Sequence, residues 1–148
     1  MEDKALLSTE VASGAEKAEL LIVIPAYNEA ENIERVVNHL TANFPQYDYV
    51  VVNDGSRDET AAICQRNGYN LLNLPVNLGL AGAFQAGLKY ADKYGYQYAV
   101  QLDGDGQHRP EYLESMIKKM EEGYDIVIGS RFVGEKKPFT MRMLGSNL

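Results

Sequence analysis

The chain has 148 residues, of which 45% are hydrophobic and 24% charged, a composition typical of one soluble globular domain. The formal net charge of −7 argues against general nucleic-acid binding, because such binding needs a basic face to neutralise phosphates. The only cysteine, Cys64, has no partner, which excludes a disulfide framework and a thiolate zinc site.

The two ends of the chain differ in charge. Residues 1–19 are acidic and polar and lack the apolar core of a secretory signal, so we expect a flexible leader. From Arg131 onward, four basic residues stand against one acidic residue, which indicates a phosphate or an anionic membrane surface near this end, or else a solvated loop. No apolar run approaches the about 20 residues that span a bilayer. We therefore expect a cytoplasmic protein that can contact the cytoplasmic face of the membrane.

Strand and helix patterns alternate along the chain. Residues 20–26 are a continuous apolar run rich in branched side chains, as expected of a strand buried on both faces. Asn28 with Glu31 predicts a capped helix start, and Ser56 with Glu59 predicts a second one. The predicted strands are residues 20–26, 49–52, 69–74, 98–102 and 125–128. The predicted helices run from Asn28 onward and over residues 60–67, 81–94 and 110–120.

This alternation predicts an α/β fold. Because the connections are too long for hairpins, we expect a mostly parallel sheet with helices on both faces. No internal linker is visible, so residues 20–148 are expected to form one domain. In such sheets ligands bind beyond the carboxyl ends of the strands. Acidic residues follow three of the five predicted strands, which turns alone do not require.

The sharpest feature follows the fourth predicted strand, where residues 103–107 read Asp-Gly-Asp-Gly-Gln. The carboxylates of Asp103 and Asp105 can approach the same small volume when the backbone turns, and the glycines permit that turn. Oxygen ligands of this kind suit Mg²⁺ or Mn²⁺, which take their remaining ligands from water and substrate phosphates. The alternatives are an ordinary turn and a calcium loop, although His108 stands where a calcium loop needs glycine.

The turn after the first predicted strand excludes two common classes of nucleotide enzyme. Residues 25–29 contain no glycine fingerprint of a dinucleotide-binding fold, and the chain has no P-loop lysine motif. The sequence therefore argues against a nicotinamide enzyme and against a nucleoside-triphosphate hydrolase.

Five short motifs occur in the order typical of glycosyltransferase family 2, which the chain resembles from Leu20 to its last residue. The motifs are Ile24-Pro-Ala-Tyr-Asn-Glu29, Val52-Asn-Asp-Gly-Ser56, Asn77-Leu-Gly79, Leu102-Asp-Gly-Asp-Gly-Gln-His108 and Gly129-Ser-Arg131. The resemblance implies the GT-A fold, a Rossmann-like form of the predicted sheet, and a UDP- or GDP-linked sugar as the donor.

The resemblance also implies roles for particular residues. The nucleotide would be bound by residues at three strand ends and in one glycine turn, namely Pro25, Ala26, Tyr27, Glu29, Asp54, Gly79, Asp103 and Gly104. Asp105 would hold the metal ion that bridges the diphosphate. Asp105 and Arg131 are the expected catalytic residues.

Within the family, the Asp-x-Asp-x-Gln-His string is similar to polyprenyl-phosphate sugar synthases of the dolichol-phosphate mannose synthase type. This similarity implies that Gln107 also reaches the Mg²⁺ or Mn²⁺ ion. It implies further that Arg131, Arg142 and Ser146 hold the phosphate of a lipid acceptor, a task for which the planar fork of arginine is suited. The expected reaction is an inverting displacement, in which the metal neutralises charge on the departing nucleoside diphosphate.

The expected partners are a nucleotide-sugar donor and a lipid-phosphate or saccharide acceptor, with no nucleic acid. Peripheral membrane contact and a homo-oligomer are compatible with the sequence. Since relatives continue past the position of Leu148, we expect the chain to be incomplete at its C-terminus.

Three alternatives stand beside this interpretation. The chain could be an inactive, truncated nucleotide-binding domain, or a family 2 enzyme that acts on a saccharide hydroxyl. A nucleotidyltransferase would need a basic, glycine-rich loop at residues 25–29, which is absent. Two residues depart from the family pattern: Asn53 stands where many relatives have aspartate, and Arg109 where an acidic or neutral residue is usual.

Overall fold

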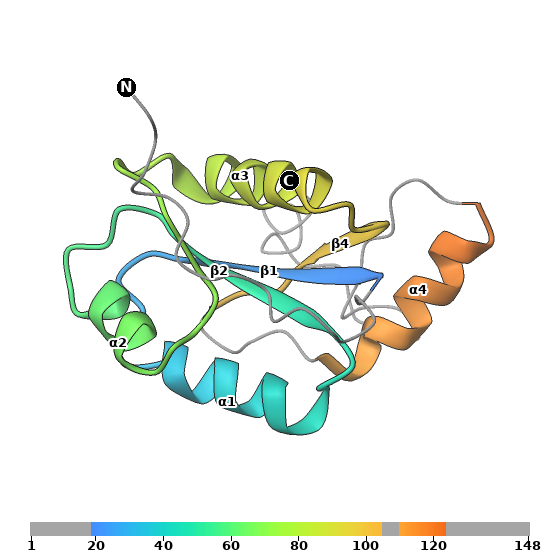
Figure 1. Ribbon diagram of the computed structural model, residues 1–148, viewed down its shortest axis with the longest axis horizontal. Helices are drawn as coiled ribbons and strands as arrows, with labels where there is room; N and C mark the ends of the chain where they lie inside the picture. The colour runs from blue at the N-terminus through green and yellow to red at the C-terminus, as the bar shows by residue number, and fades with distance from the viewer. Residues whose placement is uncertain (1–18, 105–109, 124–148) are drawn as a thin grey trace, which may run out of the picture. The chain divides into compact units, whose positions relative to one another are not determined.

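The computed structural model describes residues 19–104 and 110–123 (Figure 1). The chain divides after Pro110 into two compact units. The first unit contains the sheet and three helices, α1 to α3. The second unit contains α4 (Leu113–Glu121), which follows the 3₁₀ turn η1 (Pro110–Tyr112). None of the helices in the described part of the chain is long and apolar enough to cross a membrane.

The sheet has four described strands in the order β3-β2-β1-β4, and every neighbouring pair is parallel. The strands are β1 (Leu20–Ala26), β2 (Asp48–Asn53), β3 (Leu71–Asn73) and β4 (Tyr98–Gln101). The predicted parallel sheet is therefore confirmed. The third predicted strand, residues 69–74, is shorter than expected. The fifth, residues 125–128, lies outside the described residues.

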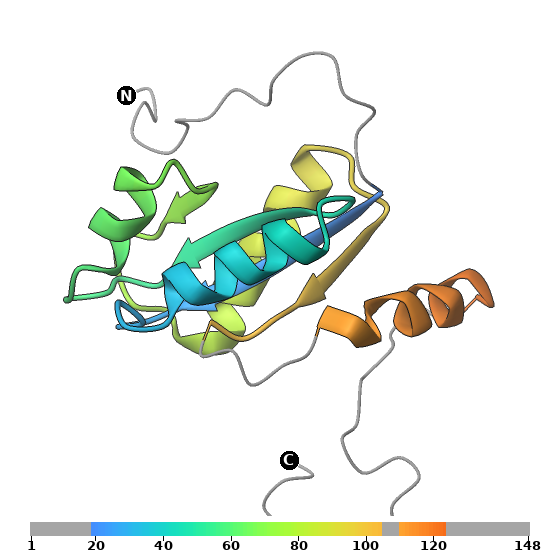
Figure 2. The same cartoon turned by 90° about the horizontal axis from the view of Figure 1, so that it is seen from below.

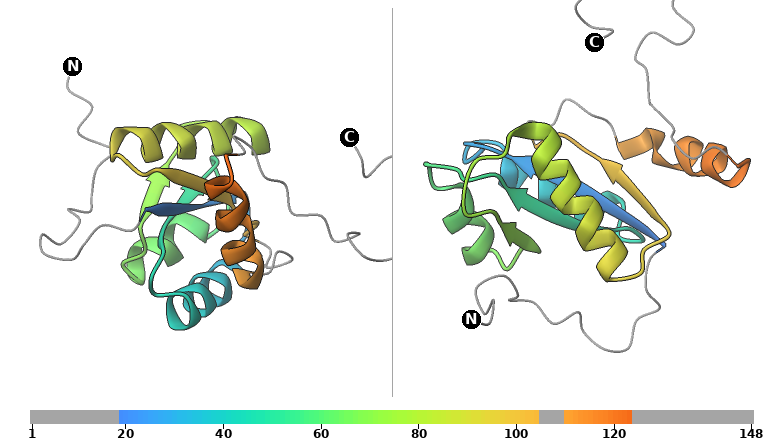
Figure 3. Two further views of the ribbon diagram at one scale, coloured as in Figure 1. Left: turned by 90° about the vertical axis from the view of Figure 1, so that its right-hand side faces the viewer. Right: turned by 90° about the horizontal axis from the view of Figure 1, so that it is seen from above.

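Helices cover both faces of this sheet, as predicted. Figure 1 and Figure 3 show α3 (Gly79–Lys93) on one face, with α1 (Ile33–Asn43) and α2 (Thr60–Arg66) on the other. Figure 2 shows α1 in front of β1 and β2, while α2 contacts β2 and β3. The strand between two helical layers must be apolar on both sides, and every residue of β1 is buried.

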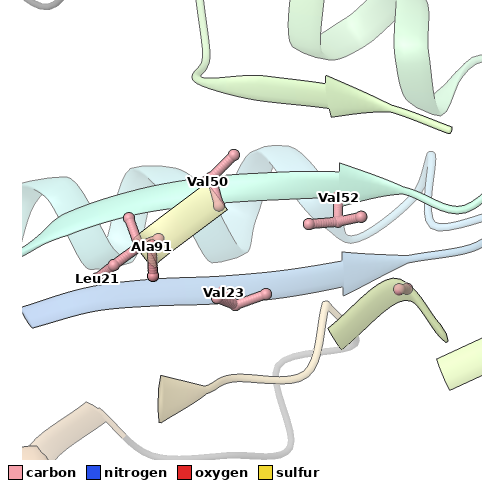
Figure 4. Packing of buried hydrophobic residues seen from close by; sticks show 6 residues of the cluster. Leu21, Val23, Val50, Val52 and Ala91 are labelled. Atoms are coloured by element: carbon pink, nitrogen blue, oxygen red, sulfur yellow. The ribbon is translucent and has the colours of Figure 1, made fainter. Parts of the chain in front are cut away.

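The core on the α3 side is built from alternate residues of the two central strands. Leu21 and Val23 of β1 pack with Val50 and Val52 of β2 and with Ala91 of α3 (Figure 4). Because side chains alternate along a strand, the intervening residues of β1 face the opposite layer, where α1 lies. The buried residues of that layer include Ile22, Ile24, Ile33, Val36, Val37 and Leu40.

Helix α3 approaches β1 closely because Gly87 has no side chain. A Cβ atom at Gly87 would lie 2.2 Å from Cγ1 and 2.8 Å from Cγ2 of Val23. Such distances are far inside van der Waals contact. The size of residue 87 therefore sets the spacing between α3 and the central strand.

Both predicted capping boxes are wrong. Asn28 has a φ of +54°, outside helical geometry, and α1 begins five residues later at Ile33. Neither α1 nor α2 has a side-chain hydrogen bond from its N-cap residue. The Oγ of Ser56 accepts from the amide of Asn28 at 3.0 Å, so this side chain bonds across to another loop. The local spacing predicted helix caps, but in the folded chain Asn28 and Ser56 form hydrogen bonds between two loops that are far apart in sequence.

Two further helix starts also differ from expectation. Helix α3 begins at Gly79, two residues before the predicted Ala81. Pro110 opens a 3₁₀ turn, and the α-helix itself begins at Leu113.

Gly87→Ala should destabilise the protein by about 1–3 kcal/mol, because the added methyl overpacks the contact with Val23. Urea unfolding of both proteins measures the difference in the free energy of unfolding. In a Val23→Ala background the same change should cost less or become favourable, since space is restored and alanine is the better helix former by about 1 kcal/mol. An equal cost in both backgrounds would contradict the proposed contact.

Candidate functional site

A pocket of about 240 Å³ lies at the carboxyl ends of the strands. Its lining comes from the ends of β1, β2 and β4 and from the first turns of α3, namely Pro25, Ala26, Tyr27, Glu29, Asp54, Leu80, Ala83, Asp103 and Gly104. The chain runs outward from β1 to β2 and β3, and β4 then returns to the other side of β1. The pocket therefore lies where the strand order reverses, the usual ligand position in open α/β sheets.

Seven of the eight residues that the sequence assigned to nucleotide binding line this one pocket. The exception is Gly79, the first residue of α3, whose neighbour Leu80 lines the pocket instead. Gly79 has a φ of +79°, and no atom lies within 4 Å of where its Cβ would be. The structure brings the seven together; the role of each stays a prediction.

Leu80 and Ala83 were missed by the sequence analysis. Both belong to the first turns of α3, and Leu80 is 59% exposed although it is a large apolar side chain. The available signal was their spacing: residues three apart share a helix face, and this face follows the glycine turn directly. An apolar residue at that position resembles ordinary core packing in sequence.

The predicted metal and acceptor residues cannot be placed. Asp105, Gln107, Arg131, Arg142 and Ser146 all lie outside the described residues. Within residues 19–104 and 110–123, no group of three histidine, cysteine, aspartate or glutamate side chains could hold a metal ion.

The end of β4 passes directly against the loop after β1. A Cβ at Gly104 would lie 3.1 Å from the carbonyl oxygen of Pro25, so a larger residue would press on that backbone. The preceding carboxylate is also oriented, since Oδ1 of Asp103 accepts from Nε2 of Gln101 at 2.9 Å. Glycine at 104 thus lets the chain leave β4 while keeping Asp103 on the pocket wall.

Asp54 joins three segments around the pocket. Its side chain is only 3% exposed, and its amide donates to the carbonyl of Ala26 at 2.9 Å. Its Oδ1 accepts from the amide of Leu78 at 2.7 Å, while its carbonyl accepts from Nδ2 of Asn77 at 3.1 Å. The ends of β1 and β2 are therefore tied to the start of α3. Besides its predicted role in nucleotide binding, this carboxylate has a structural role that the sequence did not reveal.

Glu29, which also lines the pocket, is held by hydrogen bonds to the residues that lead into α1. Oε2 of Glu29 accepts from Nδ2 of Asn32 at 3.1 Å, and its carbonyl accepts from the amides of Asn32 and Ile33. Tyr27, two residues earlier, is 44% exposed. The loop therefore presents one oriented carboxylate and one accessible aromatic ring to the pocket.

Asn53, one of the two residues that depart from the family pattern, does not line the pocket. Nδ2 of Asn53 donates to Oδ1 of Asn73 at 2.9 Å, and Oδ1 of Asn53 accepts from the amide of Ser56 at 3.2 Å. The side chain is 5% exposed. Asn53 thus pairs two neighbouring strands and has no direct place in the pocket. Arg109, the other departure, lies outside the described residues.

With this geometry established, comparison with known proteins identifies the class. The model of the family described as Glycosyl transferase family 2 matches residues 21–146, and the chain belongs to this family. A polyprenol monophosphomannose synthase from Mycolicibacterium smegmatis is 34% identical over 119 residues, covering 76% of this chain and 45% of that protein. An undecaprenyl-phosphate mannosyltransferase from Micrococcus luteus is also 34% identical over 119 residues, covering 77% and 49%. The chain thus spans about half the length of these relatives.

A solved structure supports the fold. The mannosyltransferase PcManGT from Pyrobaculum calidifontis, in complex with GDP-Man and Mn²⁺, superposes with a TM-score of 0.56 at 21% identity. The match covers 70% of this chain and 32% of that one. The expected GT-A fold is confirmed.

The turn after Asp54 depends on Gly55, which has a φ of +69°. A Cβ there would lie 2.7 Å from the amide nitrogen of Asn77 and 2.9 Å from the carbonyl carbon of Val76. Gly55→Ala should therefore destabilise the protein by about 2–4 kcal/mol, because backbone strain and a backbone clash add.

Gly68→Ala is a matched control for this change, measured by the same chemical denaturation. Gly68 has a similar φ of +67°, but nothing lies within 4 Å of its added Cβ. It should lose only about 1 kcal/mol. Equal losses in the two variants would show that the contact with Asn77 is unimportant.

Proposed function

We propose that this chain is the nucleotide-sugar-binding part of a metal-dependent glycosyltransferase that moves a sugar to a polyprenyl phosphate. The observation that carries the proposal is the gathering of seven expected nucleotide-binding residues in one pocket at the point where the strand order reverses. Leu80 and Ala83 add an apolar side to this pocket, which suits the base and ribose of a nucleotide.

The charge of the pocket favours a ligand that brings a cation. Among the described residues, the lining includes the carboxylates of Glu29, Asp54 and Asp103 but no lysine, arginine or histidine. A bare diphosphate would be repelled by these groups, whereas a divalent ion can bridge them. Asp105 follows the pocket residue Gly104 directly in the sequence. We assign such an ion, Mg²⁺ or Mn²⁺, to Asp105 and Gln107, whose side-chain oxygens are the kind of ligand that these ions prefer.

Such an ion would stabilise the negative charge on the departing nucleoside diphosphate. The chain's own residues would bind the base and ribose and orient the donor in the pocket. An oxygen of the acceptor phosphate would form a bond to the anomeric carbon as the bond from that carbon to the nucleoside diphosphate breaks. Since a phosphate is already ionised near neutral pH, this acceptor needs no dedicated general base.

The relatives support the donor and the acceptor. Two are named as a polyprenol monophosphomannose synthase and an undecaprenyl-phosphate mannosyltransferase, and the structural neighbour was solved with GDP-Man and Mn²⁺. We assign the acceptor phosphate to Arg131, Arg142 and Ser146. A lipid acceptor would bring the protein to the cytoplasmic face of a membrane, where the basic residues after position 131 favour an anionic surface.

Asp105→Ala should abolish Mn²⁺-dependent binding of GDP or UDP while leaving the fold intact. Calorimetry with and without Mn²⁺ measures the binding, and the melting temperature monitors the fold. Asp92→Ala is the control, because it removes an exposed carboxylate about 18 Å along α3 from Leu80. Undiminished Mn²⁺-dependent binding by the Asp105 variant would contradict the metal assignment.

The acceptor is tested by adding a polyprenyl phosphate and a radiolabelled nucleotide sugar with Mn²⁺. We expect label in the organic extract, and Arg131→Ala should lower this transfer by about 100-fold because a charged hydrogen bond to the phosphate is lost. Arg66→Ala, in the last turn of α2, should transfer normally. Label in a water-soluble saccharide would favour a hydroxyl acceptor. Nucleotide binding without any transfer would favour a binding domain.

A further inference from the structure

Three consecutive backbone amides in the loop after β1 donate to side-chain oxygens of residues 56–60, the segment that leads into α2 and includes its first residue. The pairs, with the amide first, are Asn28 with Ser56 at 3.0 Å, Glu29 with Thr60 at 2.9 Å and Ala30 with Asp58 at 3.1 Å. We call Ser56, Asp58 and Thr60 the clamp. The segments are about 30 residues apart in sequence, so the clamp is a tertiary feature and belongs to neither loop alone.

The clamp is internally connected. Oδ1 of Asp58 accepts from both the amide and the hydroxyl of Thr60, while Oδ2 accepts from the amide of Ala30. The Thr60 hydroxyl thus donates to a carboxylate and accepts from the Glu29 amide at the same time, an arrangement in which each hydrogen bond polarises the next. Burial raises the pKa of Asp58, but these hydrogen bonds outweigh it and the pKa is lowered.

The loop also accepts one hydrogen bond from the segment that contains the clamp. Oδ1 of Asn28 accepts from the amide of Arg57 at 2.8 Å. This bond accompanies the left-handed φ of +54° at Asn28, a conformation that asparagine tolerates better than most residues. Four hydrogen bonds therefore fix the turn at Asn28, Glu29 and Ala30.

The clamped loop is one wall of the pocket. Tyr27 and Glu29 line the pocket, and the residue between them donates its amide to the clamp. None of the three clamp residues lines the pocket itself. The hydrogen bonds of the clamp therefore reach the pocket through the loop.

We propose that Asp58 and Thr60 are positioning residues that hold the Tyr27–Ala30 loop in its ligand-binding conformation before the nucleotide arrives. The nucleotide is the ligand of the proposed function, on which this part of the inference rests. The clamp raises affinity because the free protein has already ordered the loop, so binding no longer carries that entropic cost.

Thr60 offers a sharp test because it is fully buried and has close analogues. Thr60→Val keeps the shape of the side chain and removes the hydroxyl, whereas Thr60→Ser keeps the hydroxyl. Thr41→Val is the matched control, since Oγ1 of Thr41 donates to the carbonyl of Val37 within α1, away from the pocket lining. Asp58→Ala is a second variant that removes a hydrogen bond to the loop. Because Asp58 is exposed, we expect this variant to fold.

The first measurement is amide hydrogen exchange of residues 27–30 in the nucleotide-free, full 148-residue chain. Thr60→Val and Asp58→Ala should exchange about tenfold faster than the wild type, because each variant loses one hydrogen bond to a loop amide. Thr60→Ser and Thr41→Val should exchange like the wild type. Unchanged exchange in both Thr60→Val and Asp58→Ala would overturn the clamp. This measurement needs no ligand, so it decides the clamp even if the protein binds no nucleotide.

The second measurement is the affinity for GDP and for UDP with Mn²⁺, at a temperature where every variant is folded. Thr60→Val should bind about tenfold more weakly and Thr60→Ser should recover the affinity. Faster exchange of residues 27–30 with unchanged nucleotide affinity would overturn the positioning role. A lower melting temperature with unchanged exchange and unchanged affinity would overturn it as well. If the wild type itself binds neither nucleotide, the proposed function fails, and the exchange result still stands.

Discussion

The burial of β1 between two helical layers is the constraint on which the rest of the structure depends. Every residue of this strand is buried, and it is paired with β2 on one side and β4 on the other. A strand in this position must end at the centre of the sheet edge, so the loops that follow its neighbours are brought around its own carboxyl end. The pocket forms there because the ends of three strands and the start of α3 come together at this point.

The walls of the pocket are held in place by polar side chains that accept hydrogen bonds from backbone amides. Asp54 is tied to β1 and to the entry of α3, and the loop after β1 is tied to the segment before α2. Buried polar groups need partners, and here the partners belong to the segments that line the site. The walls of the pocket are thereby held by hydrogen bonds that a ligand need not supply, which lowers the cost of ordering on binding.

The acidic lining connects this fold to the chemistry of family 2. Three carboxylates around a small cavity are unfavourable for a diphosphate alone and favourable for a diphosphate with its divalent ion. The apolar start of α3 faces the same cavity and suits the nucleoside. One pocket therefore offers an apolar surface and an acidic one, which suit the nucleoside and the metal-bound diphosphate of the proposed donor.

The sequence alone determined the parallel sheet and the helices on both faces, because these follow from local patterns of apolar runs and helical spacing, and its resemblance to family 2 indicated seven residues of the pocket. It did not determine which partner each polar group takes. Asn28 and Ser56 looked like helix caps, yet they bond to each other's loops, and Asp54 turned out to anchor the start of α3. Leu80 and Gly87 likewise acquire their roles from α3 lying against β1. Short-range spacing predicts which elements form, but only packing brings together groups that are tens of residues apart, and that packing decides where hydrogen bonds and side chains go.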